Sequence, residues 1–326
     1  MKQAHFEKLH QSAWQAFAKK IQALDKGQVQ PDAVQDFNQD YRRICQHLAL
    51  AKQRGYSYPL LENLEQLALQ GHQQFYRHKS PILEQLLAFI IIEFPATVRQ
   101  QWRSLAVSAA LFFGSFALMA ILVGLFPSLI YSLLSPAQVT NMENMYDPAQ
   151  RLIGPMSLRN HQDDWVMFGF YIMNNIGIAF QTFASGLLFG LGSIFFLLFN
   201  GLNIGAIAGH LTRTGYSETF WPFVVGHGAF ELTAIVIAGA AGLKLGSALI
   251  APGPMSRAVA LRVAAAVSIK LIGGVIIFLL LAAFIEAYWS SSTSIAVHIK
   301  YAVGAGLWLL VVLYLFASGR NRHAAE

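Results

Sequence analysis

The residues of this chain best suited to chemistry are a histidine and a glutamate inside one long apolar stretch. That stretch runs from Trp221 to Gly246, WPFVVGHGAFELTAIVIAGAAGLKLG, and carries His227 and Glu231. Their spacing of four residues places both side chains on one face of a helix. An imidazole beside a carboxylate can relay a proton, bind a cation or form an ion pair. Ionisable groups in a membrane-length apolar stretch are energetically costly and usually functional, so this pair is the first candidate site.

A buried carboxylate needs either a proton or a partner. At ~1.5 Å per residue, Glu231 lies about 15 Å along a helix from Trp221, near the centre of a bilayer. Lys270 would lie about 12 Å inside the edge of the next apolar segment, at a similar depth. The sequence therefore predicts a buried pair of Glu231 with Lys270 or with His227. We expect this pair to be structural, with a proton or ion relay as the alternative.

The same stretch does not meet the requirements of a metalloenzyme. A catalytic zinc site needs three protein ligands and an activating base, and HGAFE supplies two possible ligands. His210 is expected near the outer end of another helix. The first 103 residues contain no phosphate loop, zinc-ligand spacing or nucleophile motif. We therefore expect no metal, no cofactor and no catalytic residue, and the chain is not predicted to be an enzyme.

Amide side chains accompany these charges in the apolar segments. They are Asn174, Asn175 and Gln181 in MFGFYIMNNIGIAFQTF, and Asn200 and Asn203 in FNGLNIGAIAGH. Buried amides in lipid need hydrogen-bond partners. They either line an aqueous path or hold helices together, and the sequence leaves both interpretations open.

Glycines recur at a spacing of four residues in three apolar segments. They are Gly186 and Gly190, then Gly201, Gly205 and Gly209, then Gly242 and Gly246. This spacing lets helix backbones approach closely. We expect ordinary helix packing within the chain, with a homodimer or pore-lining face as the alternative.

A second glutamate occurs near the end of another apolar segment. Glu286 lies in AAFIEAYWSS, beside Tyr288 and Trp289. Aromatic residues gather at the membrane–water interface, where a carboxylate can reach water. We expect Glu286 to anchor the end of its helix, with attraction of cations to a pore mouth as the alternative.

The elements that position these residues are predicted to be membrane-spanning helices. Charged residues make up only 12% of the chain and hydrophobic residues 55%, outside the usage of soluble globular proteins. Each crossing needs about 20 apolar residues. The sequence predicts six such helices, at Ser104–Phe126, Trp165–Phe183, Gly186–Leu211, Trp221–Leu245, Val263–Ala287 and Ile299–Ala317. The fold class is all-α, a polytopic helix bundle, in which residues 165–211 form either two full crossings or a re-entrant pair.

Charge divides the chain into a predicted cytoplasmic helical domain, residues 1–103, and a transmembrane domain, residues 104–326. Residues 1–103 hold 13 of the 23 Lys and Arg residues and 9 of the 17 Asp and Glu residues. Lys and Arg in the short flanks of spanning helices stay in the cytoplasm. With six crossings one side collects Arg99, Arg103, Lys244, Arg257, Arg262, Arg320 and Arg322. Both termini are therefore predicted to be cytoplasmic. The loop at 127–164, which sets Arg151 and Arg159 against four acidic residues, is predicted to face outward.

The first domain is predicted to be a small helical bundle. FNQDYRRICQHLALAKQRGYS and YPLLENLEQLALQGHQQFYRH each repeat apolar residues at spacings of three and four. With the opening run and the stretch from Ile82 to Phe94, they make about four helices. The single cysteine, Cys45, excludes an intramolecular disulfide. The modest positive charge favours acidic headgroups or an acidic protein partner over nucleic acid.

Several separate blocks of this chain resemble one known family. They are MFGFYIMNNIGIAFQTFASGLLFGLGS, FNGLNIG, VVGHGAFELTAIVIAGAAGLKLG, the positions Pro252, Gly253 and Arg257, and AAFIEAYWSS. In this order they look like the signature blocks of the stage II sporulation protein M family. The segments YRRICQHLALAKQRGYS and GHQQFYRH resemble the cytoplasmic part of the family's non-sporulating bacterial members. The resemblance covers nearly the whole chain.

The resemblance implies a multi-pass protein of the bacterial cytoplasmic (inner) membrane that is not itself an enzyme. Family members in spore formers are associated with a membrane complex that holds peptidoglycan hydrolases at the septum. For this chain it implies a cell-envelope scaffold that uses the outer loop and the cytoplasmic domain, with envelope hydrolases or an AAA-type ATPase system as partners. The alternative is an ion or small-solute channel or transporter that uses the intramembrane polar residues. The resemblance gives no established chemistry to the family-like positions Asn174, Asn175, Asn200, His227, Glu231 and Glu286.

Overall fold

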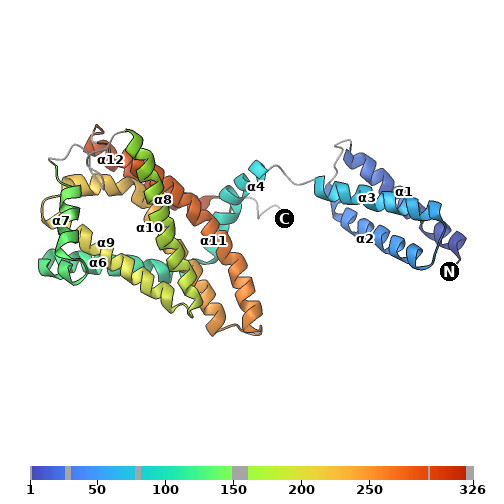
Figure 1. The fold of residues 1–326 in the computed structure, drawn as a ribbon, viewed down its shortest axis with the longest axis horizontal. Helices are drawn as coiled ribbons and strands as arrows, with labels where there is room; N and C mark the ends of the chain where they lie inside the picture. The colour runs from blue at the N-terminus through green and yellow to red at the C-terminus, as the bar shows by residue number, and fades with distance from the viewer. Residues whose placement is uncertain (1, 26–30, 78–81, 149–160, 293, 321–326) are drawn as a thin grey trace. The chain divides into compact units, whose positions relative to one another are not determined.

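The chain folds into helices that form two compact units (Figure 1). The computed structural model describes residues 2–25, 31–77, 82–148, 161–292 and 294–320. Across these residues every regular element is helical and no strand occurs, which confirms the all-α prediction. The units are Met1–Gln85 and Leu86–Glu326, and each has its own hydrophobic core. Arg151, Arg159 and Arg322 lie outside the described residues.

Three long helices build the N-terminal unit, α1 (Gln3–Asp25), α2 (Pro31–Gln53) and α3 (Tyr58–Arg77). Their amphipathic faces meet in a core that includes the fully buried side chains of Phe6, Phe17 and Leu64. Gly71 marks the closest approach, since a Cβ there would lie 2.8 Å from the Tyr41 ring and 2.9 Å from the Phe17 ring. Bulky aromatic residues therefore fill this unit, and a glycine makes room for them.

The fourth helix expected in the first domain instead crosses the division between the units. It consists of α4 (Ile82–Ala88), a π-helical turn (Phe89–Glu93) and α5 (Phe94–Gln100). The side chain of Phe94 is 2% exposed, and a Cβ on Gly274 would collide with its ring. The second unit therefore begins at Leu86, earlier than residue 104, because this segment packs against the membrane helices.

The second unit contains seven further α-helices among its described residues. They are α6 (Trp102–Leu125), α7 (Pro136–Met145), α8 (His161–Ala184), α9 (Leu191–Arg213), α10 (Ser217–Ile250), α11 (Arg257–Ile285) and α12 (Val297–Ala317). A π-helical turn, Glu286–Ser290, extends α11. Short 3-10 helices follow α6 at Pro127–Ser132 and α8 at Ser185–Leu187.

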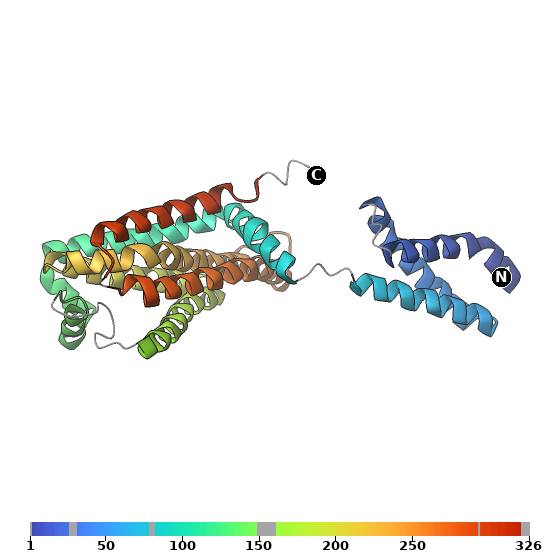
Figure 2. The same cartoon turned by 90° about the horizontal axis from the view of Figure 1, so that it is seen from above.

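Five helices in the described part of the chain are long and apolar enough to span a membrane. They are α6, α9, α10, α11 with its π-helical extension, and α12. Helix α8 is not among the five, and it carries the amides Asn174, Asn175 and Gln181. It nevertheless takes part in the bundle, where it packs against α10 and α11. Helices α6, α9 and α11 run in one direction, and α8, α10 and α12 run in the other (Figure 2). The five apolar helices establish the chain as a membrane protein.

The first and last helical segments of the second unit contact each other. Arg99 Nη1 donates to the Leu315 carbonyl at 2.8 Å, and the Tyr314 hydroxyl donates to the Ile90 carbonyl at 2.5 Å. At the opposite end, Arg213 Nη1 donates to the Gly124 carbonyl at 2.8 Å. The segment that precedes α6 and the end of α12 therefore share one end of the bundle.

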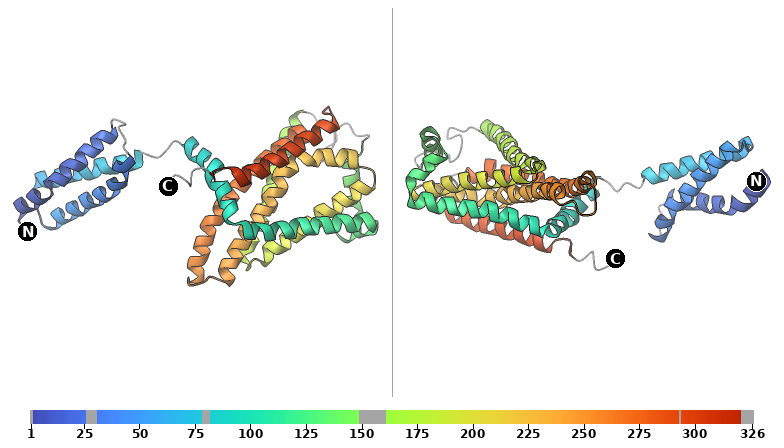
Figure 3. Two further views of the ribbon diagram at one scale, coloured as in Figure 1. Left: turned by 180° about the vertical axis from the view of Figure 1, so that it is seen from behind. Right: turned by 90° about the horizontal axis from the view of Figure 1, so that it is seen from below.

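Helix α10 is the centre of the bundle and packs against α6, α8, α9, α11 and α12. It bends along its length (Figure 3) and contains Pro222 and Gly226, residue types at which helices commonly bend. Hydroxyl groups of neighbouring helices donate to its backbone, as Ser108 does to the Val236 carbonyl at 2.7 Å. Ser268 of α11 likewise donates to the Ala241 carbonyl at 3.0 Å. These bonds hold the helices around α10.

The recurring glycines lie where helix backbones meet. A Cβ on any of them except Gly190 would collide with atoms of a neighbouring segment. The neighbours are Gly242 for Gly186, Ser115 for Gly201, Phe116 for Gly205, Ala120 for Gly209, Ser193 for Gly242 and Gly190 for Gly246. These faces are thus used for packing within the chain, and a homodimer would need another surface.

The predicted start of the third spanning helix at Gly186 is wrong by several residues. The helix α9 begins at Leu191, because Phe189 and Gly190 have positive φ angles of 54° and 81° and break the helical path. Residues 185–187 form a 3-10 turn instead. This tight connection is what lets Gly190 approach α10.

Candidate functional site

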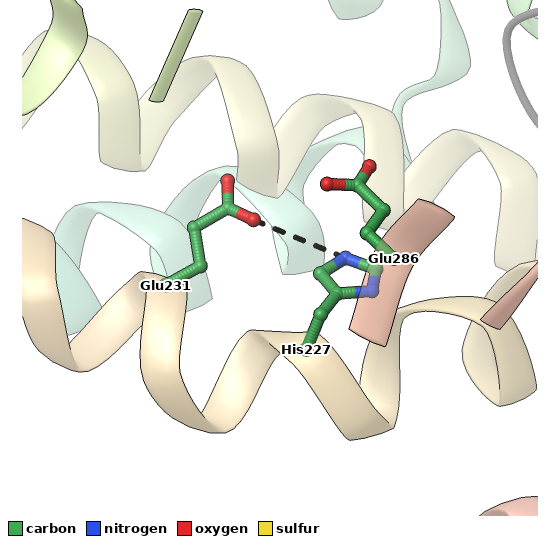
Figure 4. Close-up of side chains that lie close together, drawn as sticks. All are labelled: His227, Glu231 and Glu286. Carbon is green, nitrogen blue, oxygen red and sulfur yellow. Dashed lines mark ion pairs between the residues drawn. The ribbon is translucent and has the colours of Figure 1, made fainter. Parts of the chain in front are cut away.

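Three ionisable side chains come together inside the second unit (Figure 4). His227 and Glu231 project from one face of α10, and Glu286 reaches them from the π-helical turn that follows α11. One nitrogen or oxygen atom of each lies within 4.8 Å of the others. The distance from His227 Nε2 to Glu231 Oε2 is 4.0 Å. We call these three residues the His–Glu–Glu cluster.

The cluster is largely buried, and one of its carboxylates is partly exposed. His227 is 5% exposed and Glu286 8% exposed. The Glu231 side chain is 19% exposed. The prediction that Glu286 reaches water at a helix end is therefore wrong. The helix continues through Ser290, and the π-helical turn directs Glu286, Ala287 and Ser290 into the bundle.

Contacts on both sides hold the imidazole in place. His227 Nδ1 lies 3.2 Å from Ser290 Oγ, and the Phe223 ring meets the imidazole edge-on with centroids 5.2 Å apart. Lys300 Nζ donates to the Ser290 carbonyl at 2.7 Å. These contacts leave Nε2 directed toward the carboxylates (Figure 4).

Helix α8 adds an amide to the cluster. Asn175 is 4% exposed and lies beside Glu231 closely enough to influence its charge. The Asn175 Nδ2 atom nevertheless has no hydrogen-bond partner by distance and angle among the described residues. The contact with Glu231 is therefore too poorly aligned to count as a full hydrogen bond, which requires both a short distance and a favourable angle. Asn175 thus directs a buried, incompletely satisfied donor toward the cluster.

Two tyrosines approach the cluster as well. Tyr171, one turn before Asn175 on α8, is 3% exposed. Tyr146 follows α7, outside the spanning helices, and its ring packs edge-on against Phe223 with centroids 5.7 Å apart. Burial raises the pKa of the Tyr146 phenol, and the nearby Glu286, Tyr171 and Glu231 raise it further. The phenol therefore remains neutral and closes the α7 side of the cluster.

Lys270 does not belong to the cluster. Its Nζ atom lies 2.9 Å from Glu93 Oε2, and both side chains are about half exposed, at 52% and 50%. The predicted alternative of a buried Lys270–Glu231 pair is therefore wrong. The π-helical turn before α5 instead supplies the carboxylate of Glu93, to which Lys270 donates a hydrogen bond.

Most of the remaining amides are satisfied by their own helices. Asn200 Nδ2 donates to the Phe196 carbonyl at 2.7 Å, and Asn203 Nδ2 donates to the Phe199 carbonyl at 2.8 Å. Each bond spans four residues of α9. Asn174 bonds to Asn175 at 3.0 Å, and Gln181 is exposed. Of the five predicted amides, Asn175 is the one that the fold brings beside the cluster.

A second histidine–carboxylate pair lies apart from the cluster. His210 Nε2 of α9 is 2.7 Å from Glu143 Oε1 of α7. His210 is 7% exposed, while the Glu143 side chain is 32% exposed. The pair links α7 to the C-terminal end of α9. This agrees with the prediction that His210 lies near the end of its helix.

Sequence reasoning missed Tyr146, Tyr171 and Lys300. Tyr171 does carry a signal, because Met167, Tyr171 and Asn175 follow one face of α8 at spacings of four. Lys300 lies in the first turn of α12, where a basic residue normally reaches the membrane edge. No local pattern relates these residues to α10.

The arrangement combines two carboxylates, an imidazole and an amide in a buried setting. Such groups can exchange protons, attract a cation or bind a metal ion with nitrogen and oxygen ligands. The chemistry that the cluster supports best is the binding of positive charge.

Comparison with known proteins gives the chain a family. The model of the family described as stage II sporulation protein M matches residues 108–291, more than half of the chain. A domain of unknown function (DUF8413) matches residues 4–77, which lie in the N-terminal unit. No solved structure matches.

A relative of this chain matches it over a shorter stretch than the family model does. The "Uncharacterized protein MJ0793" of Methanocaldococcus jannaschii is 32% identical over 75 residues, which is 23% of this chain and 42% of that protein. The chain thus matches less than half the length of this relative. The family match over residues 108–291 covers α9, α10 and the His–Glu–Glu cluster. The chain therefore belongs to the stage II sporulation protein M family.

Proposed function

We propose that this protein is a non-enzymatic membrane scaffold that organises a cell-envelope complex. The observation that carries the proposal is the separate hydrophobic core of the N-terminal unit, built around Phe6, Phe17 and Leu64. A unit with its own core can bind a partner without disturbing the membrane helices. Family membership supports a role in the envelope, and the partners we propose are envelope hydrolases or a cytoplasmic AAA-type ATPase system.

We place the protein in the bacterial cytoplasmic membrane with both termini in the cytoplasm. Basic residues support this orientation, because Arg99 and Arg103 flank the start of α6, and Arg257 begins α11. The alternating directions of the helices bring the starts of α6 and α11 to one end of the bundle (Figure 2). Glu143 and Asp147, at the other end, belong to the loop that we place outside.

Co-purification from native membranes tests the scaffold. Tagged full-length protein and a variant without residues 1–77 are extracted in mild detergent, and the bound proteins are identified by mass spectrometry. The scaffold predicts stoichiometric partners of the full chain and loss of the cytoplasmic partner from the shortened chain, which remains in the membrane. A partner-free full-length protein would contradict the proposal.

A second function, conduction of an ion or small solute, is favoured by one observation. Asn175 and the His–Glu–Glu cluster place polar groups in the interior of the bundle. Buried polar groups of this kind are typical of ion and proton pathways. Flux into liposomes, compared between wild type and Glu231→Gln, tests it. Equal flux from both proteins, or none from the wild type, would count against conduction.

A further inference from the structure

We propose that His227, Glu231 and Glu286 bind a divalent transition-metal ion, of the zinc class, inside the membrane unit. The site goes beyond the scaffold function and does not depend on it. It also revises the sequence-based expectation of no metal, which rested on HGAFE offering only two ligands. The third ligand, Glu286, comes from a segment more than 50 residues away in the chain.

The spacing of the three side chains fits a single small ion. Two ligand atoms held ~2.1 Å from a tetrahedral ion are about 3.4 Å apart. The three candidate ligand atoms already lie within 4.8 Å of one another, and His227 Nε2 is 4.0 Å from Glu231 Oε2. Glutamate side chains have three rotatable bonds, so rotation can move the carboxylates toward a shared ion.

Charge favours a cation at this position. Two ionised carboxylates facing each other in a buried site repel, and each loses its hydration. A divalent cation balances both negative charges, whereas an imidazole can balance one at most. The Lys300 ammonium is near, but its described hydrogen bond goes to the Ser290 carbonyl. The neutral phenol of Tyr146 adds no positive charge.

The surroundings of His227 resemble the support that metal-binding histidines receive. Such a histidine binds metal through one ring nitrogen and donates the other N–H to a hydrogen-bond acceptor. Nδ1 of His227 faces Ser290 Oγ at 3.2 Å, and Lys300 holds the Ser290 backbone. With the proton on Nδ1, Nε2 carries the lone pair that points toward the carboxylates.

Asn175 supplies an independent observation. Its Nδ2 donor is buried beside Glu231 and makes no hydrogen bond of favourable distance and angle in the described structure. Burying a donor without an acceptor is energetically unfavourable. A three-ligand site leaves a fourth position for water, and the oxygen of that water would accept the Asn175 N–H.

The ligand types select the kind of metal. Calcium and magnesium prefer sites made entirely of oxygen atoms. Imidazole together with carboxylates suits zinc and neighbouring transition metals. The proposed ion is therefore zinc or a divalent metal of similar size, bound by one nitrogen and two carboxylates.

Metal analysis of the purified full-length protein tests the proposal. Wild type in detergent is loaded with Zn²⁺, freed of excess metal and analysed by plasma mass spectrometry, and the ligands are identified by zinc-edge X-ray absorption. We expect one zinc per chain, with one histidine nitrogen and carboxylate oxygens around it. A wild-type protein that retains no divalent metal, as expected for a cluster that binds only protons, would overturn the proposal. So would a ligand set without histidine.

Matched variants locate the metal. Glu286→Gln and His227→Gln should each weaken zinc affinity by about 100-fold or more, since even supporting residues contribute 10- to 100-fold. Glu143→Gln and His210→Gln are the controls, because they alter the other histidine–carboxylate pair. Full zinc binding by the cluster variants, or equal loss in the controls, would overturn the assignment. If the cluster variants do not fold, the ligand set of the wild type decides.

Discussion

Both units of this protein bury large side chains, but they differ in how many small residues lie where their helices meet. In the N-terminal unit, large aromatic and aliphatic side chains such as Phe17 and Trp14 point inward. In the membrane unit, the interior of α10 is rich in alanine and glycine, while Leu118 and Ile121 of α6 are 56% and 62% exposed. Water drives large side chains into a core, whereas lipid accepts them outside, so membrane helices pack through small residues. The comparison predicts that the two units fail for opposite reasons.

The largest effect should follow from enlarging a residue at a contact between membrane helices. In Gly242→Leu, the new side chain would have to occupy the space of Ser193 Oγ and the Phe183 carbonyl. Backbone atoms cannot move aside as side chains do, so we expect loss of most folded protein. Fluorescence-detected size-exclusion chromatography measures the yield.

The matched control for this substitution lies on another spanning helix. At Gly306 of α12, no atom of a neighbouring described segment lies within 4 Å of the place that a Cβ would take. Gly306→Leu should therefore leave the yield near that of wild type. Similar losses from both substitutions would mean that any added bulk harms these helices. The prediction that close contacts around Gly242, and not added bulk in general, cause the loss would then be wrong.

Removing a large side chain should be the damaging change in the N-terminal unit. Phe17 is 1% exposed, so Phe17→Ala leaves a cavity and should destabilise this unit by about 3–5 kcal/mol. Leu9 is 58% exposed, and Leu9→Ala should change stability by less than about 0.5 kcal/mol. Hydrogen exchange on the full chain follows α1–α3 separately from α6–α12. Loss of protection in both units after Phe17→Ala would show that they do not fold independently.

Acid should weaken the N-terminal unit through one histidine. The pKa of His47 is lowered by burial and, to a smaller extent, by His10 and Arg43. The unfolded chain, with an ordinary pKa near 6.5, therefore binds a proton more readily, and stability falls as the pH drops below about 6.5. Protonation also removes the acceptor that Nδ1 offers to Trp14 Nε1 at 3.0 Å.

Thermal unfolding of the full chain, followed through hydrogen exchange of α1–α3, measures this pH dependence. Between about pH 7.5 and pH 5.5 the wild type should lose stability, and His47→Gln should flatten the loss. His5→Gln serves as the control with the same change of residue type. An unaltered pH dependence in the His47 variant would assign the effect elsewhere.

Local patterns predicted the helices and the pairing of two of the three cluster residues, but not the assembly of the cluster. The long apolar runs identified α6 and α9–α12, because their length and composition are local properties. The four-residue spacing of His227 and Glu231 also predicted a shared face correctly. Glu286 joins them only through the packing of α11 against α10 and the π-helical turn, which no spacing in the sequence encodes. The Lys270–Glu93 pair was not predicted for the same reason, since it also depends on how distant segments pack.

The smallest effect should come from breaking that exposed pair. Both side chains of the Lys270–Glu93 pair are about half accessible, so breaking the pair leaves no cavity between helices. Glu93→Gln keeps the size of the side chain and an oxygen that can accept from Lys270, so it should lower the stability of the membrane unit by only about 1 kcal/mol. Thermal denaturation at low and high salt measures the change, with Glu84→Gln as the control in the neighbouring helix α4. A loss as large as that from Gly242→Leu would mean that charge pairs, and not close helix contacts, hold the membrane unit together.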